Sequence, residues 1–267
     1  MPTPIEILLD PISIAAIAIY AVLIAWETLA PARPLPAVRG WRLKGLLAFA
    51  AYFYVSSYLP LVWDRHLAPY RLVDLEGLGT IGGGLAGVLV YELGVYGWHR
   101  AMHRFDPLWR VFHQMHHSAE RVDTYGAFWF SPWDMVGWTA LGSLTLVVVG
   151  LTPGAATFML LGTFFLGTFQ HMNVRTPQWL GYVFQRPESH SVHHERGVHY
   201  YNFSDLPVFD MLFRTFRNPE SFAERQGFYD GASSRVLEML AFKDVSEPPV
   251  AGAAPGAREP VARLTHP

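Results

Sequence analysis

Residues 98–118 read WHRAMHRFDPLWRVFHQMHHS and carry five histidines, more than any other stretch of similar length in this chain. His99 and His103 are four residues apart, and His113 precedes His116 by three residues and His117 by four. Residues three and four apart lie on one face of an α-helix, so His113 is expected to point together with both. The stretch therefore predicts two helical segments that each present a cluster of imidazoles.

A third cluster, His190, His193 and His194, repeats the second spacing about seventy residues further on. Eight of the chain's 12 histidines lie in these three clusters. An isolated pair four residues apart is more often structural than metal-binding, but eight clustered imidazoles exceed what one tetrahedral ion uses. Neutral imidazole suits zinc, copper, iron and nickel. The pattern predicts a site for two metal ions.

The composition indicates a membrane protein. Of 267 residues, 51% are hydrophobic and 16% are charged, against roughly 25% charged residues in a typical soluble domain. The net charge of -2 gives no electrostatic case for a nucleic-acid partner. The chain has no cysteine, which excludes disulfides, thiolate zinc sites, iron–sulfur clusters and a catalytic thiol. Any metal must therefore be held by nitrogen and oxygen atoms.

Five apolar segments follow one another along the chain. Three of them, at about 12–30, 45–63 and 78–99, are long enough to span a hydrocarbon core. The segments at 135–150 and 154–169 are shorter, and the turn between them predicts a hairpin that crosses the membrane or dips into it. In the third segment, Gly79, Gly83 and Gly87 are spaced for close helix packing.

These segments predict an all-α integral membrane protein with four or five spans and a cytoplasmic, histidine-rich helical metal domain. We divide the chain into N-terminal spans and loops (1–76), a catalytic domain (77–229) and a C-terminal segment (230–267). The last of these is expected to be largely a disordered tail, because it becomes rich in Pro, Ala and Gly from residue 246.

The distribution of basic residues predicts the orientation. The loop 31–44 carries Arg33, Arg39, Arg42 and Lys44, which places it on the cytoplasmic side by the positive-inside rule. The third span then ends inside at His99, and the hairpin returns the chain to the same side at residue 171. All three histidine clusters are thus predicted to share the cytoplasmic face, where the active site would lie.

Two residues outside the clusters complete the predicted site. His171, at the end of the fifth apolar segment, is a ninth candidate ligand on the same face. Glu92 lies seven residues before His99 on the same helical face. We interpret Glu92 as an acceptor that orients a ligand imidazole, with direct ligation as the alternative. His199, five residues past His194, is left open as a ligand.

The three clusters resemble the histidine boxes of the fatty acid hydroxylase/sterol desaturase superfamily. The boxes are H-x3-H in WHRAMHR and H-x2-HH in FHQMHHS and in SHSVHHE, and the resemblance covers roughly residues 84–216. Supporting matches are the acid before the first box, Pro187 before the third box, and the closing segment YNFSDLPVFDMLFRTF around Asn202 and Asp210. Asn173, two residues past His171, is a further match and a second candidate for supporting the ligands.

The resemblance implies a non-haem site of two iron ions that activates dioxygen and oxidises an unactivated C–H bond of a lipid-like substrate such as a sterol or fatty acid. The outcome would be hydroxylation or desaturation. Electrons would come from an external donor (a cytochrome, ferredoxin or reductase), and membrane lipids would surround the protein. The implied iron ligands are His99, His103, His113, His116, His117, His171, His190, His193 and His194.

The chain departs from the family pattern in two places. Many members have an Arg-x-His-Pro element where this chain has Trp129-Phe130-Ser131-Pro132, and Arg214 stands where glycine is usual. Both changes bear on substrate contacts more than on metal binding. Two rival functions remain open at this point. One is a membrane zinc-dependent hydrolase, and the other is a non-enzymatic metal transporter or sensor.

Overall fold

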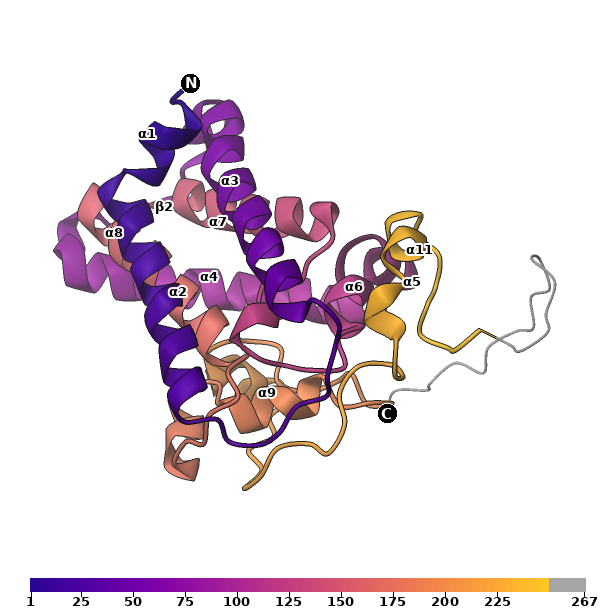
Figure 1. Ribbon diagram of the computed structural model, residues 1–267. Coiled ribbons are helices and arrows are strands. Elements are labelled where there is room, and N and C mark those ends of the chain that lie inside the picture. The colour runs from indigo at the N-terminus through magenta and orange to yellow at the C-terminus, as the bar shows by residue number, and fades with distance from the viewer. Residues whose placement is uncertain (250–267) are drawn as a thin grey trace.

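Three helices in the computed structural model, which describes residues 1–249, are long and apolar enough to cross a membrane (Figure 1). They are α2 (Pro11–Leu29), α3 (Trp41–Leu67) and the segment Glu76–Arg104, which comprises η2 (Glu76–Leu78) and α4 (Gly79–Arg104). Only 17% and 6% of the apolar windows of α2 and α3 are buried inside the protein. Such exposed apolar faces need a lipid environment, as the sequence predicts.

The two shorter apolar segments form α7 (Pro132–Val148) and α8 (Pro153–Phe169), which pack mainly against α3 and α4 and not against each other, so the prediction of a closed hairpin is wrong. Ser131 and Thr152 cap these helices through their hydroxyls, and a proline follows each cap at the first helical position. The turn between them contains β2 (Val149–Gly150), which pairs in parallel with β1 (Val73–Asp74). With 17 residues each, α7 and α8 fall short of the three longer helices, and their entry into the membrane stays a prediction.

Helix α4 packs closely against α8, and its glycines make this approach feasible. A Cβ at Gly83 would lie 3.2 Å from the Cβ of Ala155, and one at Gly87 would lie 2.8 Å from Leu151 Cδ1. The packing interpretation is confirmed for these two glycines. It is wrong for Gly79, which starts α4 at φ +65 with nothing within 4 Å of its Cβ position, so its role is conformational.

The N-terminal helix lies at one end of the helix assembly, and the elements not yet described are short. At one end, α1 (Pro4–Leu8) lies beside α3, where the hydroxyls of Tyr54 and Tyr58 donate to the carbonyls of Pro4 and Pro2 (Figure 1). The remaining elements are short: η1 (Ala68–Tyr70), α5 (Asp106–Leu108), the π-helical turn η3 (Trp109–His113), α6 (Gln114–His117), η4 (Thr124–Gly126), η5 (Gln178–Tyr182), α9 (Pro187–His193), α10 (Pro207–Leu212), η6 (Ala232–Ser234) and α11 (Val236–Leu240).

The arginine-rich loop lies at the same end as the histidine clusters. The N–H of Ala32 donates to the carbonyl of Asn173 at 2.8 Å, and Arg121 Nη1 donates to the carbonyl of Pro36 at 3.1 Å. These contacts join the loop to the segments that follow the second cluster and His171. The shared end agrees with the predicted topology, and its assignment to the cytoplasm stays a prediction.

The described part of the C-terminal segment is packed against the protein. Met239 and Val245 are buried in a core cluster with Trp41, Met115 and Trp129. These apolar anchors explain why residues 230–249 follow the surface of the second histidine cluster. Residues 250–267, on which most of the predicted disordered tail falls, lie outside the described residues, and the proposed domain boundaries stay predictions.

Candidate metal centre

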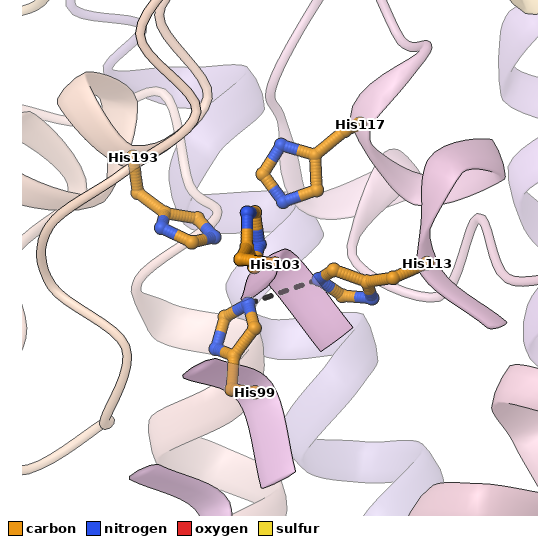
Figure 2. Close-up of side chains that lie close together, drawn as sticks. All are labelled: His99, His103, His113, His117 and His193. Carbon is orange, nitrogen blue, oxygen red and sulfur yellow. Dashed lines mark hydrogen bonds between the residues drawn. The ribbon is translucent and has the colours of Figure 1, made fainter. Parts of the chain in front are cut away.

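The nine histidines singled out from the sequence form two groups of ring nitrogens, and the nitrogens of each group lie within 4.8 Å of one another. The five-histidine group, whose rings converge in Figure 2, contains His99, His103, His113, His117 and His193. The four-histidine group contains His116, His171, His190 and His194. No cysteine or carboxylate belongs to either group among residues 1–249.

The second and third clusters divide their histidines between the groups in a reciprocal way. His113 and His117 enter the five-histidine group and His116 the four-histidine group, whereas His190 and His194 enter the four-histidine group and His193 the other. At about 100° per residue, position i+4 returns to within about 40° of position i, and i+3 falls about 60° away on the other side. The expectation that His113 points together with both neighbours is therefore right for His117 and wrong for His116.

The inward nitrogens are spaced as ligands of a common ion would be. Nε2–Nε2 distances are 2.9 Å for His113–His99, 3.0 Å for His171–His116, 3.0 Å for His190–His171 and 3.1 Å for His194–His190. With metal–nitrogen bonds of about 2.1 Å, neighbouring ligands of an octahedral ion stand about 3.0 Å apart. The groups therefore have the dimensions of metal sites.

The outward nitrogens decide which ring nitrogen carries the proton. The Nδ1–H of His99, His193 and His171 donates at 2.7 Å to the backbone carbonyls of Phe203, Tyr201 and Gly167, respectively. A neutral imidazole has one donor and one acceptor nitrogen, so Nε2 of each ring presents a lone pair to the group. Lone pairs that face one another in a buried space need a cation between them. The inward Nε2 atoms of His103, His117 and His193 have no hydrogen-bond partner in the described structure.

Burial keeps the imidazoles in the form that binds metals. Desolvation lowers the pKa of His113, His116, His117 and His190 well below the usual value, and neighbouring imidazoles lower it further. These rings are therefore neutral near pH 7. Metal binding there needs no displacement of a proton from the inward nitrogen.

Asp134 is a functional candidate that the sequence reasoning missed. Its Oδ2 lies 3.0 Å from His113 Nδ1, and both side chains are almost fully buried. A carboxylate behind a ligand imidazole fixes the ring and raises its basicity. The sequence signal was Ser131-Pro132 three residues earlier, a helix start that places an acid in the first turn of α7. This is the segment where the family's Arg-x-His-Pro element is absent.

His199 belongs to neither group, and its ring contacts that of His117. Its Nδ1 lies 3.0 Å from His117 Nδ1, so one of the two nitrogens donates to the other. The residue has φ +43, in the left-handed region that side chains other than glycine seldom adopt. Tyr201 and Asn202, at φ +70 and +52, share this strain, and the carbonyl of Tyr201 holds His193.

The closing segment holds this strained loop in place. Asn202 donates through Nδ2 to the carbonyls of Ser189 and Arg217, and Asp210 accepts from the N–H groups of Phe203 and Ser204 at 2.8 and 2.9 Å. Arg214 also lies in the left-handed region, at φ +64, a conformation that glycine adopts more readily than other residues.

Among the described residues, Glu92 and Asn173 bond to loop segments near the site and not to the imidazoles themselves. Glu92 Oε2 accepts from Ser204 Oγ and from the backbone N–H of Asp205, both at 2.9 Å, and so anchors the loop whose Phe203 carbonyl holds His99. Asn173 donates through its backbone N–H to Glu27 and through Nδ2 to the carbonyl of Arg33. Within residues 1–249 neither side chain bonds an imidazole, which corrects the expectation of direct support.

A cavity of about 660 Å³ leads from the far end of the helices to the two groups. At the metal end it is lined by His99, His113, His116, His171 and His190. Its middle is aromatic and apolar, and its outer end reaches α1. The walls come from α2, α3, α7 and α8, so an apolar molecule could reach the histidines from between the membrane helices.

Comparison with known proteins agrees with this geometry. Residues 84–215 match the fatty acid hydroxylase family. The ornithine lipid hydroxylase OlsE of Rhizobium tropici is 34% identical over 138 residues, which cover 50% of this chain and 41% of that protein. This chain thus aligns with less than half the length of that relative. No solved structure matches the chain.

The matched region contains all nine histidines of the two groups and also Glu92, Asn173 and Asp210. It begins within α4 and ends at Thr215, which donates to Asp210. These matches support the fatty acid hydroxylase/sterol desaturase superfamily, whose histidine boxes the three clusters resemble.

Proposed function

We propose that this protein is a membrane-bound, non-haem di-iron oxidoreductase that hydroxylates or desaturates a lipid-like substrate. The observation that carries the proposal is the pair of all-imidazole groups at the inner end of an apolar cavity. The family match and the lipid hydroxylase among the relatives support it.

One iron would be held by the five-histidine group and the other by the four-histidine group. Bound there, the pair would supply the activation of dioxygen and the oxidation of a C–H bond, with electrons from an external cytochrome, ferredoxin or reductase. Asp134 and the carbonyls of Phe203, Tyr201 and Gly167 fix the imidazoles in orientation and tautomer. Such preset ligands limit the reorganisation that metal binding requires.

The cavity walls would position the substrate. Phe128, Phe130 and Phe164 line the middle of the cavity, and Phe130 also packs against the ring of His116. Aromatic walls exclude water and hold an alkyl chain by burial of apolar surface. An apolar substrate dissolved in the bilayer would enter between the helices and meet the histidines at the inner end.

The relative's name makes ornithine lipid the first substrate to test, together with fatty acids and sterols. Comparison of the lipids of cells with and without this gene tests the proposal directly. We expect one lipid to gain one oxygen atom or to lose two hydrogens, and only in the presence of dioxygen. Unchanged lipids, together with purified protein that contains no iron, would count against the proposal.

The rival functions fit the geometry less well. A hydrolytic zinc site uses about three protein ligands and an adjacent carboxylate base, whereas these groups hold five and four imidazoles and Asp134 lies behind His113. A transporter would need histidines along a path across the membrane. Zinc as the bound metal, with dioxygen-independent turnover, would favour the hydrolase.

The cytoplasmic location of the active site is part of the proposal. Because the chain has no cysteine, single cysteines can report orientation without background. We expect Arg39→Cys, in the arginine-rich loop, to be protected from an impermeant thiol reagent in intact cells. Leu72→Cys, an exposed position in the loop before η2, should be labelled. The reverse pattern would invert the topology.

A further inference from the structure

A carboxylate with no assigned task lines the cavity at its metal end. Asp205 forms part of the cavity wall together with Gln170, His171 and His190. The residue is 8% exposed, and it faces a space otherwise bounded mainly by aromatic and aliphatic side chains. None of the contacts that orient the imidazoles involves this side chain.

The carboxylate is held rigidly and has spare capacity as an acceptor. Its Oδ1 accepts from Gln170 Nε2 at 2.6 Å, whereas Oδ2 accepts no hydrogen bond from any described residue. The backbone N–H of Asp205 donates to Glu92 at 2.9 Å, and its carbonyl accepts from the N–H of Gln185 at 2.8 Å. The backbone is thus fixed on both sides, and the side chain is preorganised.

Gly167 places Oδ2 near the four-histidine group. A Cβ at Gly167 would lie 3.3 Å from Asp205 Oδ2, so the absence of a side chain leaves room for this oxygen against α8. The carbonyl of the same glycine accepts from His171 Nδ1 at 2.7 Å. The free oxygen and the ring of His171 therefore lie against the same turn of the helix.

No described basic side chain pairs with this carboxylate. Among residues 1–249, no arginine, lysine or histidine forms an ion pair with Asp205. Burial raises the pKa of Asp205, because desolvation disfavours the ionised carboxylate more than the bond from Gln170 favours it. A buried carboxylate with an unfilled acceptor is costly unless a ligand supplies a donor.

We propose that Asp205 Oδ2 accepts a hydrogen bond from an N–H or O–H group of the lipid substrate and holds that group beside the four-histidine group. The substrate class is then a lipid with an amine, amide or hydroxyl donor close to the carbon that is oxidised. A plain alkyl chain would leave the acceptor unfilled. This inference rests on the proposed oxidation of lipids and specifies what that site selects.

The test compares two lipids on full-length protein in lipid bilayers with an electron-donor system. One is ornithine lipid, whose amino-acid part supplies N–H donors, and the other is a fatty acid methyl ester, which has none. The variants are Asp205→Asn, which keeps the shape and one acceptor oxygen, and Asp205→Leu, which removes the acceptor. Thr163→Val is the matched control, because Thr163 lines the same cavity but its hydroxyl is bonded to the carbonyl of Met159.

We expect Asp205→Leu to lower kcat/KM for ornithine lipid by about tenfold to a hundredfold, with turnover of the ester and iron content within about twofold of wild type. Asp205→Asn should show a smaller loss of the same kind, and Thr163→Val should change both substrates by the same factor. A parallel loss on both lipids, or a loss of iron, in the Asp205→Asn variant would overturn the inference in favour of a structural role.

Two outcomes separate this inference from the proposed function. If the wild-type protein oxidises the ester as well as it oxidises donor-bearing lipids, the proposed function stands and the role of Asp205 is overturned. If iron-loaded wild-type protein oxidises neither these lipids nor a lipid extract, the proposed function fails, and the inference falls with it.

Discussion

The two histidine groups are built from the same kind of residue but differ in number and in access. The five-histidine group has two members on the cavity wall, His99 and His113, and is backed by Asp134 and His199. Three of the four members of the other group line the cavity, namely His116, His171 and His190. Fewer ligands and more contact with the cavity leave the four-histidine group more open to small molecules.

This difference teaches that cluster spacing alone does not define a metal site. The two H-x2-HH clusters each send their i,i+4 pair to one group and the intervening i+3 histidine to the other. Each group therefore contains the i,i+4 pair of one cluster and the i+3 histidine of the other cluster. The experiments below test how unequal the groups are, and how strongly they depend on each other.

Loss of one ligand should affect the smaller group most. His194→Ala leaves three imidazoles in the four-histidine group, and His117→Ala leaves four in the other. We expect His194→Ala to lose at least one of the two proposed irons and to lower turnover by more than about a hundredfold. His117→Ala should retain more iron, because four nitrogen ligands remain. Iron per protein by elemental analysis is the measurement, and equal iron retention in both variants would remove the proposed inequality.

The next variant tests whether the side chain of Asp134 supports the five-histidine group through its contact with His113. Asp134→Asn keeps the size of the side chain but replaces the carboxyl group beside His113 Nδ1 by an amide. We expect turnover or iron affinity to fall by about tenfold to a hundredfold, measured by titration of the metal-free protein with iron. Asp244→Asn is the control, because Asp244 is exposed, where it pairs with Arg110 and accepts from the N–H of Ser246, and its replacement should leave both quantities unchanged. An equal effect in the two variants would contradict the assignment.

His199 should matter less than Asp134, because a neutral partner makes a weaker hydrogen bond than a carboxylate. His199→Ala leaves His117 Nδ1 without its partner at 3.0 Å. We expect a loss in iron affinity of up to about tenfold, and His199→Asn, which can still bond a ring nitrogen, should restore part of it. A complete loss of one iron in the alanine variant would instead make His199 a ligand.

The smallest effect concerns the packing of α4, which carries His99 and His103, against Leu151 and α8, which ends two residues before His171. Gly87→Ala would place a Cβ 2.8 Å from Leu151 Cδ1 at the α4–α8 contact, whereas Gly97→Ala, in the same helix, meets nothing within 4 Å. We expect the first to lower stability by about 1–3 kcal/mol and the second to raise it by up to about 1 kcal/mol. Thermal unfolding in detergent ranks the two, and the opposite order would show that the contact is not tight.

Much of the site could be predicted because its residues are concentrated and chemically distinctive. All nine histidines, the two short apolar helices and the shared end of the arginine-rich loop follow from spacing, hydropathy and charge. The distribution of His116 and His193 between groups depends on where two neighbouring sites lie around a helix axis, which spacing alone leaves undetermined. The roles of Phe203 and Tyr201 are invisible in the sequence, because their carbonyls act through a strained loop and not through side chains.

Asp134 and Glu92 show where local sequence misleads. Glu92 has the spacing of a residue facing the histidines of its own helix, yet its partners are on the loop 204–206, more than a hundred residues away. Asp134 has no histidine near it in sequence, yet it meets His113 because α7 packs against the π-helical turn that ends at that residue. Both contacts are formed between segments that are far apart in the sequence, so local spacing does not reveal them.

The exchange of histidines between the second and third clusters has a consequence for the integrity of the chain. A cation in either group would link α6 to α9, segments that are roughly seventy residues apart, and would act as a cross-link in a protein that has no cysteine. A link that closes a loop of this length restricts the unfolded chain strongly, by about 4 kcal/mol in the loop-entropy description used for disulfides. Metal supply would then govern not only what the protein does but also how long it survives in the membrane.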